Sequence, residues 1–161
     1  MKKKLKTNVF LVDDDPLFLK VMETQFKDQT YYNIHAFSTG EECLKNLSQK
    51  PDIIFLDYYL NTTKSKADNG LAILDKIKAF DPKIQVIMLS SQDSMSIAIN
   101  CLRHDAFDYI VKSEAAFVRA QKAISSLLLQ IKLKKELILY KTVGIIAFSA
   151  ILILLSLLLI T

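Results

Sequence analysis

Three short runs of apolar residues constrain the fold of this chain more than any other feature of its sequence. The runs are VFLV at 9–12, IIFL at 53–56 and VIML at 86–89, and no polar residue interrupts them. A strand that is apolar at every position needs cover on both faces, which is typical of the central strands of a parallel sheet. We therefore expect these three runs to form the middle of such a sheet.

Segments of helical length and pattern separate these runs from each other and from two weaker β-prone runs, at 32–37 and 107–111. Asp15 before Pro16, and the capping-box spacing of residues 38–41, mark the starts of the first two helices. The next three helices are predicted to start at Asn69-Gly70, Asp93 and Ser113. Five successive strand and helix pairs predict an α/β fold with a doubly wound, five-stranded parallel sheet and right-handed crossovers.

The last helical pattern does not stop where this predicted domain ends. It continues from Glu114 to Lys141 without Pro or Gly. An apolar stripe runs along it, formed by Phe117, Ile124, Leu128, Ile131 and Ile138. The part beyond the domain could be a rigid stalk, a coiled-coil-like dimer seam, or an amphipathic helix that lies on a bilayer surface. The sequence leaves these alternatives open.

An uncharged segment at 143–160 follows this pattern. As a helix it would be about 27 Å long at about 1.5 Å per residue, close to the thickness of the hydrocarbon core of a bilayer. Four lysines precede it, at positions 132, 134, 135 and 141. Because positive charge favours the cytoplasmic side, we expect residues 1–142 to lie in the cytoplasm. A buried core helix or an oligomer seam is the alternative.

These patterns predict three segments. Residues 1–125 form the domain, residues 126–142 a helical stalk with a basic juxtamembrane part, and residues 143–160 a single-pass transmembrane helix in contact with membrane lipid. The predicted location is the cell inner (cytoplasmic) membrane. Cys43 and Cys101 lie in predicted helices without metal-binding spacing, so we expect buried, reduced thiols, as in a cytosolic domain.

Functional side chains follow four of the five predicted strands directly. In an open parallel sheet, ligands bind beyond the carboxyl ends of the strands, so these side chains should converge. They are Asp13 and Asp14, Asp57, Ser90 and Lys112. Each has an ordinary alternative, since a carboxylate after a strand often caps a helix and a lysine there is usually solvated. Together, in this order, they indicate a site.

The clustered carboxylates of this site repel one another unless a cation compensates their charge. Oxygen ligands of this kind suit Mg²⁺. A carboxylate beside such an ion can act as a nucleophile on phosphorus and form an acyl phosphate. Lys112 would then neutralise charge on the phosphoryl group. The sequence therefore predicts phosphoryl chemistry at the carboxyl edge of the sheet.

Four segments resemble, in order and spacing, the motifs of the receiver domain of bacterial two-component response regulators. They are VDDDP at 12–16, PDIIFLD at 51–57, VIMLS at 86–90 and DYIVK at 108–112. The resemblance covers about residues 7 to 125. It implies the flavodoxin-like receiver fold with strand order 2-1-3-4-5, here with an extended C-terminal helix that runs into a transmembrane helix.

The same resemblance implies that Asp57 accepts a phosphoryl group from a histidine kinase or a phosphotransfer protein. Asp13, Asp14 and Asp57, with the backbone carbonyl of Tyr59, would hold Mg²⁺. Ser90 would bond a phosphoryl oxygen, and Tyr109 would turn inward when Ser90 moves. This pair would switch the surface made by the fourth helix, the fifth strand and the fifth helix. Asp15 is expected to be a helix cap instead of a metal ligand.

The chain departs from the family pattern near the site. Asn61 stands where the family usually has Pro, and residues 61–68 are interpreted as a polar insertion. Ser113 stands where a Pro usually follows the lysine, so the turn that places Lys112 could differ from that of the family. Phosphodonor docking or the lifetime of the phosphoryl group could differ for these reasons. None of the departures removes a catalytic group.

We expect a membrane-anchored receiver that signals through protein–protein interaction with an unknown downstream protein; a homodimer is a further candidate assembly. The alternative is a degenerate receiver that acts as a constitutive membrane-bound scaffold. After Lys112 only helical sequence is expected, so we predict no helix-turn-helix, no nucleic-acid binding and no separate enzymatic output domain beyond self-phosphorylation on Asp57. With three glycines, the chain carries no nucleotide-binding glycine loop.

Overall fold

The computed structural model of the chain describes residues 7–27, 31–60 and 69–160, with the backbone alone at 27, 132, 135, 147 and 150–160. The predicted polar insertion at 61–68 lies outside the described residues. Two compact units divide the chain, residues 1–121 and residues 122–161, and each is described by itself.

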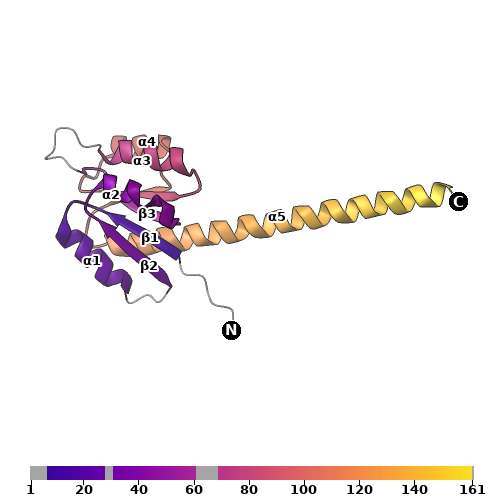
Figure 1. The fold of residues 1–161 in the computed structure, drawn as a ribbon, viewed down its shortest axis with the longest axis horizontal. Helices are drawn as coiled ribbons and strands as arrows, with labels where there is room; N and C mark the ends of the chain where they lie inside the picture. Colours follow the sequence, from indigo (N-terminus) through magenta and orange to yellow (C-terminus); the bar gives the residue numbers. More distant parts are fainter. Residues whose placement is uncertain (1–6, 28–30, 61–68, 161) are drawn as a thin grey trace. The chain divides into compact units, whose positions relative to one another are not determined.

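A five-stranded parallel sheet forms the centre of the first unit (Figure 1). Its strands are β1 Thr7–Val12, β2 Tyr32–Phe37, β3 Ile53–Asp57, β4 Gln85–Ser90 and β5 Asp108–Val111. They are arranged in the order β2-β1-β3-β4-β5. The three apolar runs of the sequence lie in the adjacent strands β1, β3 and β4, and all their side chains are buried. The predicted fold class and strand order are confirmed.

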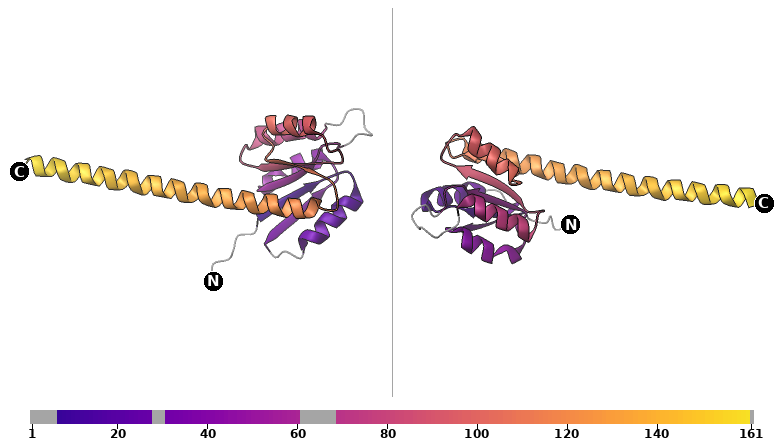
Figure 2. Two further views of the ribbon diagram at one scale, coloured as in Figure 1. Left: turned by 180° about the vertical axis from the view of Figure 1, so that it is seen from behind. Right: turned by 90° about the horizontal axis from the view of Figure 1, so that it is seen from above.

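Helices cover both faces of this sheet (Figure 2). The elements are α1 Pro16–Lys27, α2 Gly40–Lys45, the short 3₁₀ helix η1 Leu47–Gln49, α3 Gly70–Phe80, α4 Met95–Arg103 and α5 Ala116–Ile160. On one face, Phe10, Ile54 and Val86 pack in a cluster with side chains of α2, α3 and α4. On the other, Phe26 of α1 lies 5.8 Å from Phe55 of β3 and 5.1 Å from Phe117 of α5, between ring centroids. Alternate strand residues therefore serve two separate cores.

Two of the predicted helix caps are confirmed. Asp15 Oδ1 accepts hydrogen bonds from the amides of Leu17 and Phe18, at 2.8 and 3.3 Å. Asn69 Oδ1 accepts one from the amide of Ala72 at 2.9 Å. Each cap satisfies amides that have no partner inside the helix, and so fixes where the chain leaves a strand end.

The other helix starts are shifted by one to three residues. In α2 the capping pair is Thr39 and Glu42, because the Glu42 amide donates to Thr39 Oγ1, so the box lies one residue later than residues 38–41. The fourth helix is preceded by Ser94 instead of Asp93, and the fifth begins at Ala116 instead of near Ser113. Sequence patterns place helix ends only to within a few residues.

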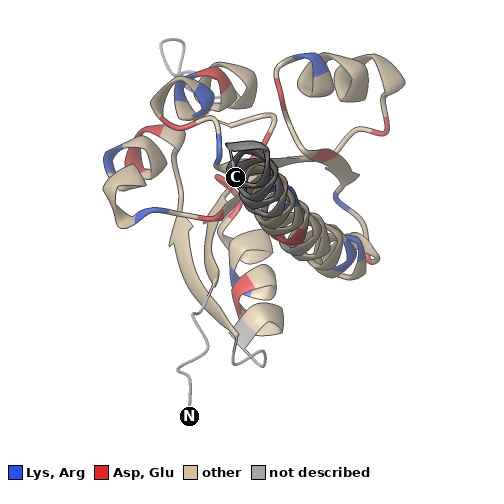
Figure 3. Cartoon of the chain, turned by 90° about the vertical axis from the view of Figure 1, so that its right-hand side faces the viewer, with Lys and Arg blue, Asp and Glu red and all other residues tan. Residues whose placement is uncertain are grey.

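The predicted thiols are confirmed, since Cys43 and Cys101 are both buried and free. Charged residues of both signs are interspersed along the helices, whereas the strands carry only Asp57 and Asp108 (Figure 3).

The second unit consists of the continuation of α5 as far as Ile160. Its helical conformation agrees with the helical pattern of the sequence. In the part of the chain whose side chains are described, no helix is both long and apolar enough to cross a membrane. The predicted transmembrane helix at 143–160 is therefore not supported by the structure, and most of its side chains lie outside the described residues.

Candidate functional site

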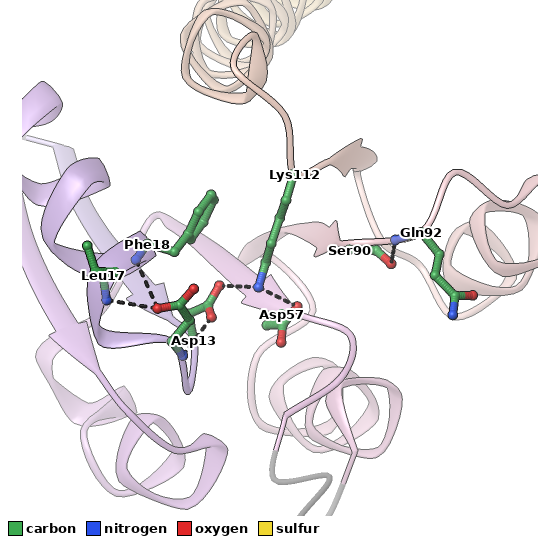
Figure 4. A network of polar contacts seen from close by, with 8 residues as sticks. Asp13, Leu17, Phe18, Asp57, Ser90, Gln92 and Lys112 are labelled. Atoms are coloured by element: carbon green, nitrogen blue, oxygen red, sulfur yellow. Dashed lines mark hydrogen bonds and ion pairs between the residues drawn. The ribbon is translucent and has the colours of Figure 1, made fainter.

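The carboxyl ends of β1, β3, β4 and β5 meet at one edge of the sheet (Figure 4). Parallel register brings them level: Val12 pairs with Leu56, Asp57 with Leu89, and Ser90 with Val111. The next residues along the chain therefore project into one region. The structure thus brings together the predicted side chains of Asp13, Asp57 and Lys112, with Ser90 at the end of the neighbouring strand.

Lys112 bridges the two buried carboxylates of this site. Its Nζ lies 2.6 Å from Asp13 Oδ2 and 3.0 Å from Asp57 Oδ1. Asp13 is 1% exposed and Asp57 is 3% exposed, so water screens these interactions little. Because ion pairs strengthen as water is excluded, one ammonium holds both carboxylates in place.

This single ammonium leaves the carboxylates incompletely satisfied. Apart from Lys112, Asp13 Oδ2 and Asp57 Oδ1 accept no hydrogen bond from any described residue. Asp14 is exposed, and one carboxylate oxygen from each of the three aspartates lies within 4.8 Å of the other two. The two buried carboxylates share one lysine, and the third carboxylate lies close by. Buried, under-satisfied carboxylate oxygens are the donors that a hard cation such as Mg²⁺ binds, so the residues fit a divalent cation.

The pKa values of Asp13 and Asp57 show how strongly burial opposes ionisation of these carboxyl groups. Burial raises the pKa of Asp13 to about 6, against the lowering effect of the Lys112 hydrogen bond. Burial also raises the pKa of Asp57, which Lys112 lowers in part. Burial alone would lower the pKa of Lys112, but the two carboxylates outweigh it and raise that pKa. Each carboxylate is thus less easily ionised than in water, and added positive charge would relieve this.

Two contacts place Lys112 despite the Ser113 that follows it. The Lys112 amide donates to the Ser90 carbonyl at 2.7 Å, which continues the pairing of β4 and β5. Lys112 Nζ also lies 4.9 Å from the centre of the Phe18 ring, close enough for a cation–π interaction. Sequence reasoning missed Phe18. The sequence did contain a signal for it. A residue in the first turn of the helix that follows Asp13 and Asp14 lies close to the site, and Phe18 is an aromatic residue at such a position.

Ser90 and Tyr109 are linked through the backbone of Gln92. The Gln92 amide donates to Ser90 Oγ at 3.1 Å, and the Tyr109 hydroxyl donates to the Gln92 carbonyl at 2.5 Å. Ser90 is fully buried and Tyr109 partly buried. Two hydrogen bonds therefore connect the predicted switch residues, Ser90 and Tyr109, through Gln92. Sequence reasoning missed Gln92, because its backbone takes part and its side chain gives no signal.

Tyr59 follows Asp57 by two residues, and its amide hydrogen bond lowers the pKa of Asp57. The structure does not test whether its carbonyl binds a metal, so that role stays a prediction. His104 forms a surface contact with Asp75 of α3, with 2.7 Å between Nδ1 and Oδ1. It takes no part in the site.

Comparisons with known proteins agree with this geometry. The pattern of the response regulator receiver domain family matches residues 9–123. The chemotaxis protein CheY of Listeria monocytogenes is 33% identical over 104 residues, which cover 63% of this chain and 83% of CheY. The nitrogen assimilation regulatory protein NtrX of Azorhizobium caulinodans is 25% identical over 126 residues, 76% of this chain. The chain spans about a quarter of NtrX, since the match covers 27% of it.

A solved structure gives the same result for the fold. The signal receiver domain of a LuxO repressor protein from Vibrio parahaemolyticus superposes with a TM-score of 0.71 at 26% identity. The superposition covers 81% of this chain and 96% of that domain. The family match at residues 9–123 contains every side chain of the site described above and the five strands, except for the first two residues of β1. The chain belongs to the response regulator receiver domain family.

Proposed function

We propose that this chain accepts a phosphoryl group on Asp57 from a histidine kinase or a phosphotransfer protein. The observation that carries the proposal is the buried Asp57 carboxylate at the end of β3, held by Lys112 beside Asp13. A nucleophile needs a defined orientation, and the ion pair provides it. Membership of the receiver family supports a phosphate-accepting role.

In the proposed reaction, a carboxylate oxygen of Asp57 attacks the phosphorus atom. The bond between phosphorus and the donor's imidazole nitrogen breaks, and its electron pair stays on that nitrogen, which takes up a proton. Lys112 neutralises a phosphoryl oxygen, and the Ser90 hydroxyl donates a hydrogen bond to another. The product is an acyl phosphate on Asp57. This transfer is the only chemical step that we propose for the chain.

Asp13, Asp14 and Asp57, with the Tyr59 backbone carbonyl, are the groups that would hold Mg²⁺. When bound, Mg²⁺ supplies positive charge that offsets both the carboxylates and the incoming phosphoryl group. The residues themselves orient the site: the Asp13 carboxylate keeps Lys112 close to Asp57, and the amide of Asp15 donates to Asp13 Oδ1 at 3.0 Å.

Output is proposed to pass through the contacts of Ser90. If its hydroxyl turns to a phosphoryl oxygen, the Gln92 amide loses its acceptor, and the Tyr109 hydroxyl is bonded to the same residue. The change would reach the surface of α4, β5 and α5. The side chains of Met95, Ile99 and Leu102 are exposed apolar residues on α4 there, which supports binding of a partner protein or of a second copy.

The proposed transfer is tested with acetyl phosphate, and with beryllofluoride in the presence of Mg²⁺. The wild-type chain should gain the mass of one phosphoryl group and bind beryllofluoride, whereas Asp57→Asn should do neither. Asp52→Asn is the matched control, because Asp52 is an exposed carboxylate just before the other end of β3. No response in the wild-type chain would contradict the proposal and favour a constitutive scaffold.

Self-association is tested by crosslinking with and without beryllofluoride. We expect the oligomer to change when the site is occupied, because Tyr109 is coupled to Ser90 through Gln92. An identical crosslinking pattern under both conditions would contradict output through self-association.

We also propose that residues 143–160 anchor the chain in the inner membrane with the receiver in the cytoplasm. The uncharged length of this segment and the lysines before it support the proposal. Cell fractionation tests it, with a variant that carries Leu154→Lys and Leu155→Lys, since central lysines oppose insertion by about 3 kcal/mol each. The wild-type chain should sediment with membranes and the variant should not. Equal distribution of the two would contradict the anchor.

A further inference from the structure

Gly70, the first residue of α3, lies directly against the backbone of Asp57. A Cβ atom at position 70 would be 2.1 Å from the Asp57 carbonyl oxygen and 2.8 Å from the Tyr58 Cα. Among the described glycines none has a positive φ, so the backbone conformation does not demand glycine here. What demands it is space, because the atoms in the way belong to the main chain of the site itself.

Hydrogen bonds fix the same stretch of backbone from two sides. The Gly70 amide donates to the Tyr58 carbonyl at 3.1 Å, and the Tyr58 amide donates to the Leu89 carbonyl of β4 at 2.8 Å. The Asn69 cap makes the first turn of α3 rigid. The peptide units after Asp57 are thus held between β4 and the start of α3. The two described ends of the β3–α3 connection are bonded to each other beside the site.

We propose that Gly70 is a positioning residue: its missing side chain lets α3 fix the backbone from which Asp57 and the Tyr59 carbonyl reach the cation. This inference rests on the proposed function. Gly70 itself would contact neither the phosphoryl group nor the metal, but it would position the groups that do.

A Cβ atom at position 70 would require a large displacement of the backbone. Contacts of Cβ atoms below 3.0 Å essentially never occur, so an alanine at position 70 must move away from the Asp57 carbonyl by about 1 Å. Metal ligands keep their distances to within about 0.2 Å. A shift several times larger than this tolerance, applied to the backbone of a ligand, should weaken cation binding even when the domain stays folded.

Gly40 provides a matched control. It is also buried and also the first residue of a helix, α2. A Cβ there would lie 2.4 Å from Ile73 Cγ1 and 2.6 Å from Ile73 Cδ1, which are side-chain atoms in the core. Alanine at either glycine therefore crowds a buried neighbour at a helix start. The two substitutions differ in whether the crowded atoms belong to the site.

The experiment compares Gly70→Ala and Gly40→Ala in the full chain. Mn²⁺ affinity is measured by electron paramagnetic resonance below the melting temperature, and thermal unfolding is measured alongside. Both variants should melt at a lower temperature, but only Gly70→Ala should lose Mn²⁺ affinity, by roughly tenfold or more. A folded Gly70→Ala with wild-type affinity, or an equal loss in Gly40→Ala, would overturn the inference.

Amide hydrogen exchange in the wild-type chain gives a second measurement if Gly70→Ala does not fold. Mg²⁺ should slow exchange of the Gly70 amide by a larger factor than exchange of the Cys43 amide, which donates to Thr39 in the first turn of α2. Slowing of both amides by the same factor would overturn the inference. If the wild-type chain binds neither Mn²⁺ nor beryllofluoride, the proposed function itself fails. If it binds both and Gly70→Ala binds equally well, only the positioning role fails.

Discussion

The two halves of the site are held together by different kinds of polar contact. Beside β1 and β3, two buried carboxylates share the ammonium of Lys112. Beside β4 and β5, Ser90 and Tyr109 are joined through the backbone of Gln92 by neutral hydrogen bonds. We call these the charged half and the neutral half. They lie at the same sheet edge, yet they should respond to different changes in their surroundings.

The two halves differ in their need for a cation. A neutral hydrogen bond contributes about 1 kcal/mol, and both bonds of the neutral half are formed without any added ion. In the charged half, the pKa of Asp13 is raised from 3.8 to about 6, which corresponds to about 3 kcal/mol against ionisation. The charged half is therefore strained at neutral pH without metal, whereas the neutral half is satisfied.

Asp13→Asn should have the largest effect on the charged half. Removing one buried negative charge should lower Mg²⁺ affinity at least roughly tenfold and raise the stability of the metal-free protein at pH 7 by up to about 3 kcal/mol. Calorimetric titration and urea unfolding measure the two effects. Asp52→Asn is the control for Mg²⁺ affinity, which should not change, because Asp52 is exposed at the other end of β3 and an asparagine oxygen can still accept the hydrogen bond from the Asn8 amide. A metal-free Asp13→Asn that is less stable than wild type would show that the charged half is not strained.

The stability of the metal-free protein should depend on pH through Asp13. A folded-state pKa above the unfolded value means that the folded state binds the Asp13 proton more tightly, so stability falls as the pH rises from 3.8 to about 6. Acidification from pH 7 to pH 5 should therefore raise the free energy of unfolding of the metal-free protein by about 1 kcal/mol, because Asp13 takes up a proton. The measurement is the difference between wild type and Asp13→Asn in urea unfolding at the two pH values. The same difference in the free energy of unfolding at both pH values would contradict this contribution of Asp13.

Tyr109→Phe tests the neutral half alone. It removes the hydroxyl that donates to the Gln92 carbonyl and keeps the ring, so it should cost about 1 kcal/mol of stability. Mg²⁺ affinity should stay at the wild-type value, because no charge changes. The two are measured by urea unfolding and calorimetric titration. A loss of Mg²⁺ affinity as large as that of Asp13→Asn would show that the two halves are not separate.

Phe18→Leu should have the smallest effect. The ring lies over the Lys112 ammonium, and a cation–π interaction of this kind contributes about 0.5–1 kcal/mol. Carbon NMR of the lysine Cε should show a small fall in the pKa of Lys112, because the ring stabilises the charged form. Phe18→Tyr keeps an aromatic face and should retain the wild-type pKa. Equal pKa values in Phe18→Leu and wild type would exclude a role for the ring.

Much of the fold was predictable because it depends on local pattern. The apolar runs at 9–12, 53–56 and 86–89 identified central strands, since only a strand covered on both faces is apolar throughout. Helix starts were less certain. Glu41 and Glu42 both follow Thr39, and only the structure shows that Glu42 completes the cap of α2. Adjacent residues of the same type give the sequence no means to choose between them.

The strand ends could be read from local pattern, and with them the prediction that Asp13, Asp57, Ser90 and Lys112 would meet. Parallel strands carry their carboxyl ends to one edge whatever the details of packing. Three contacts are seen only in the folded chain: Phe18 lies over Lys112, Gln92 joins Ser90 to Tyr109, and Gly70 meets the backbone of Asp57. These contacts join residues on different elements, so they depend on how the helices pack against the sheet, which no local pattern encodes.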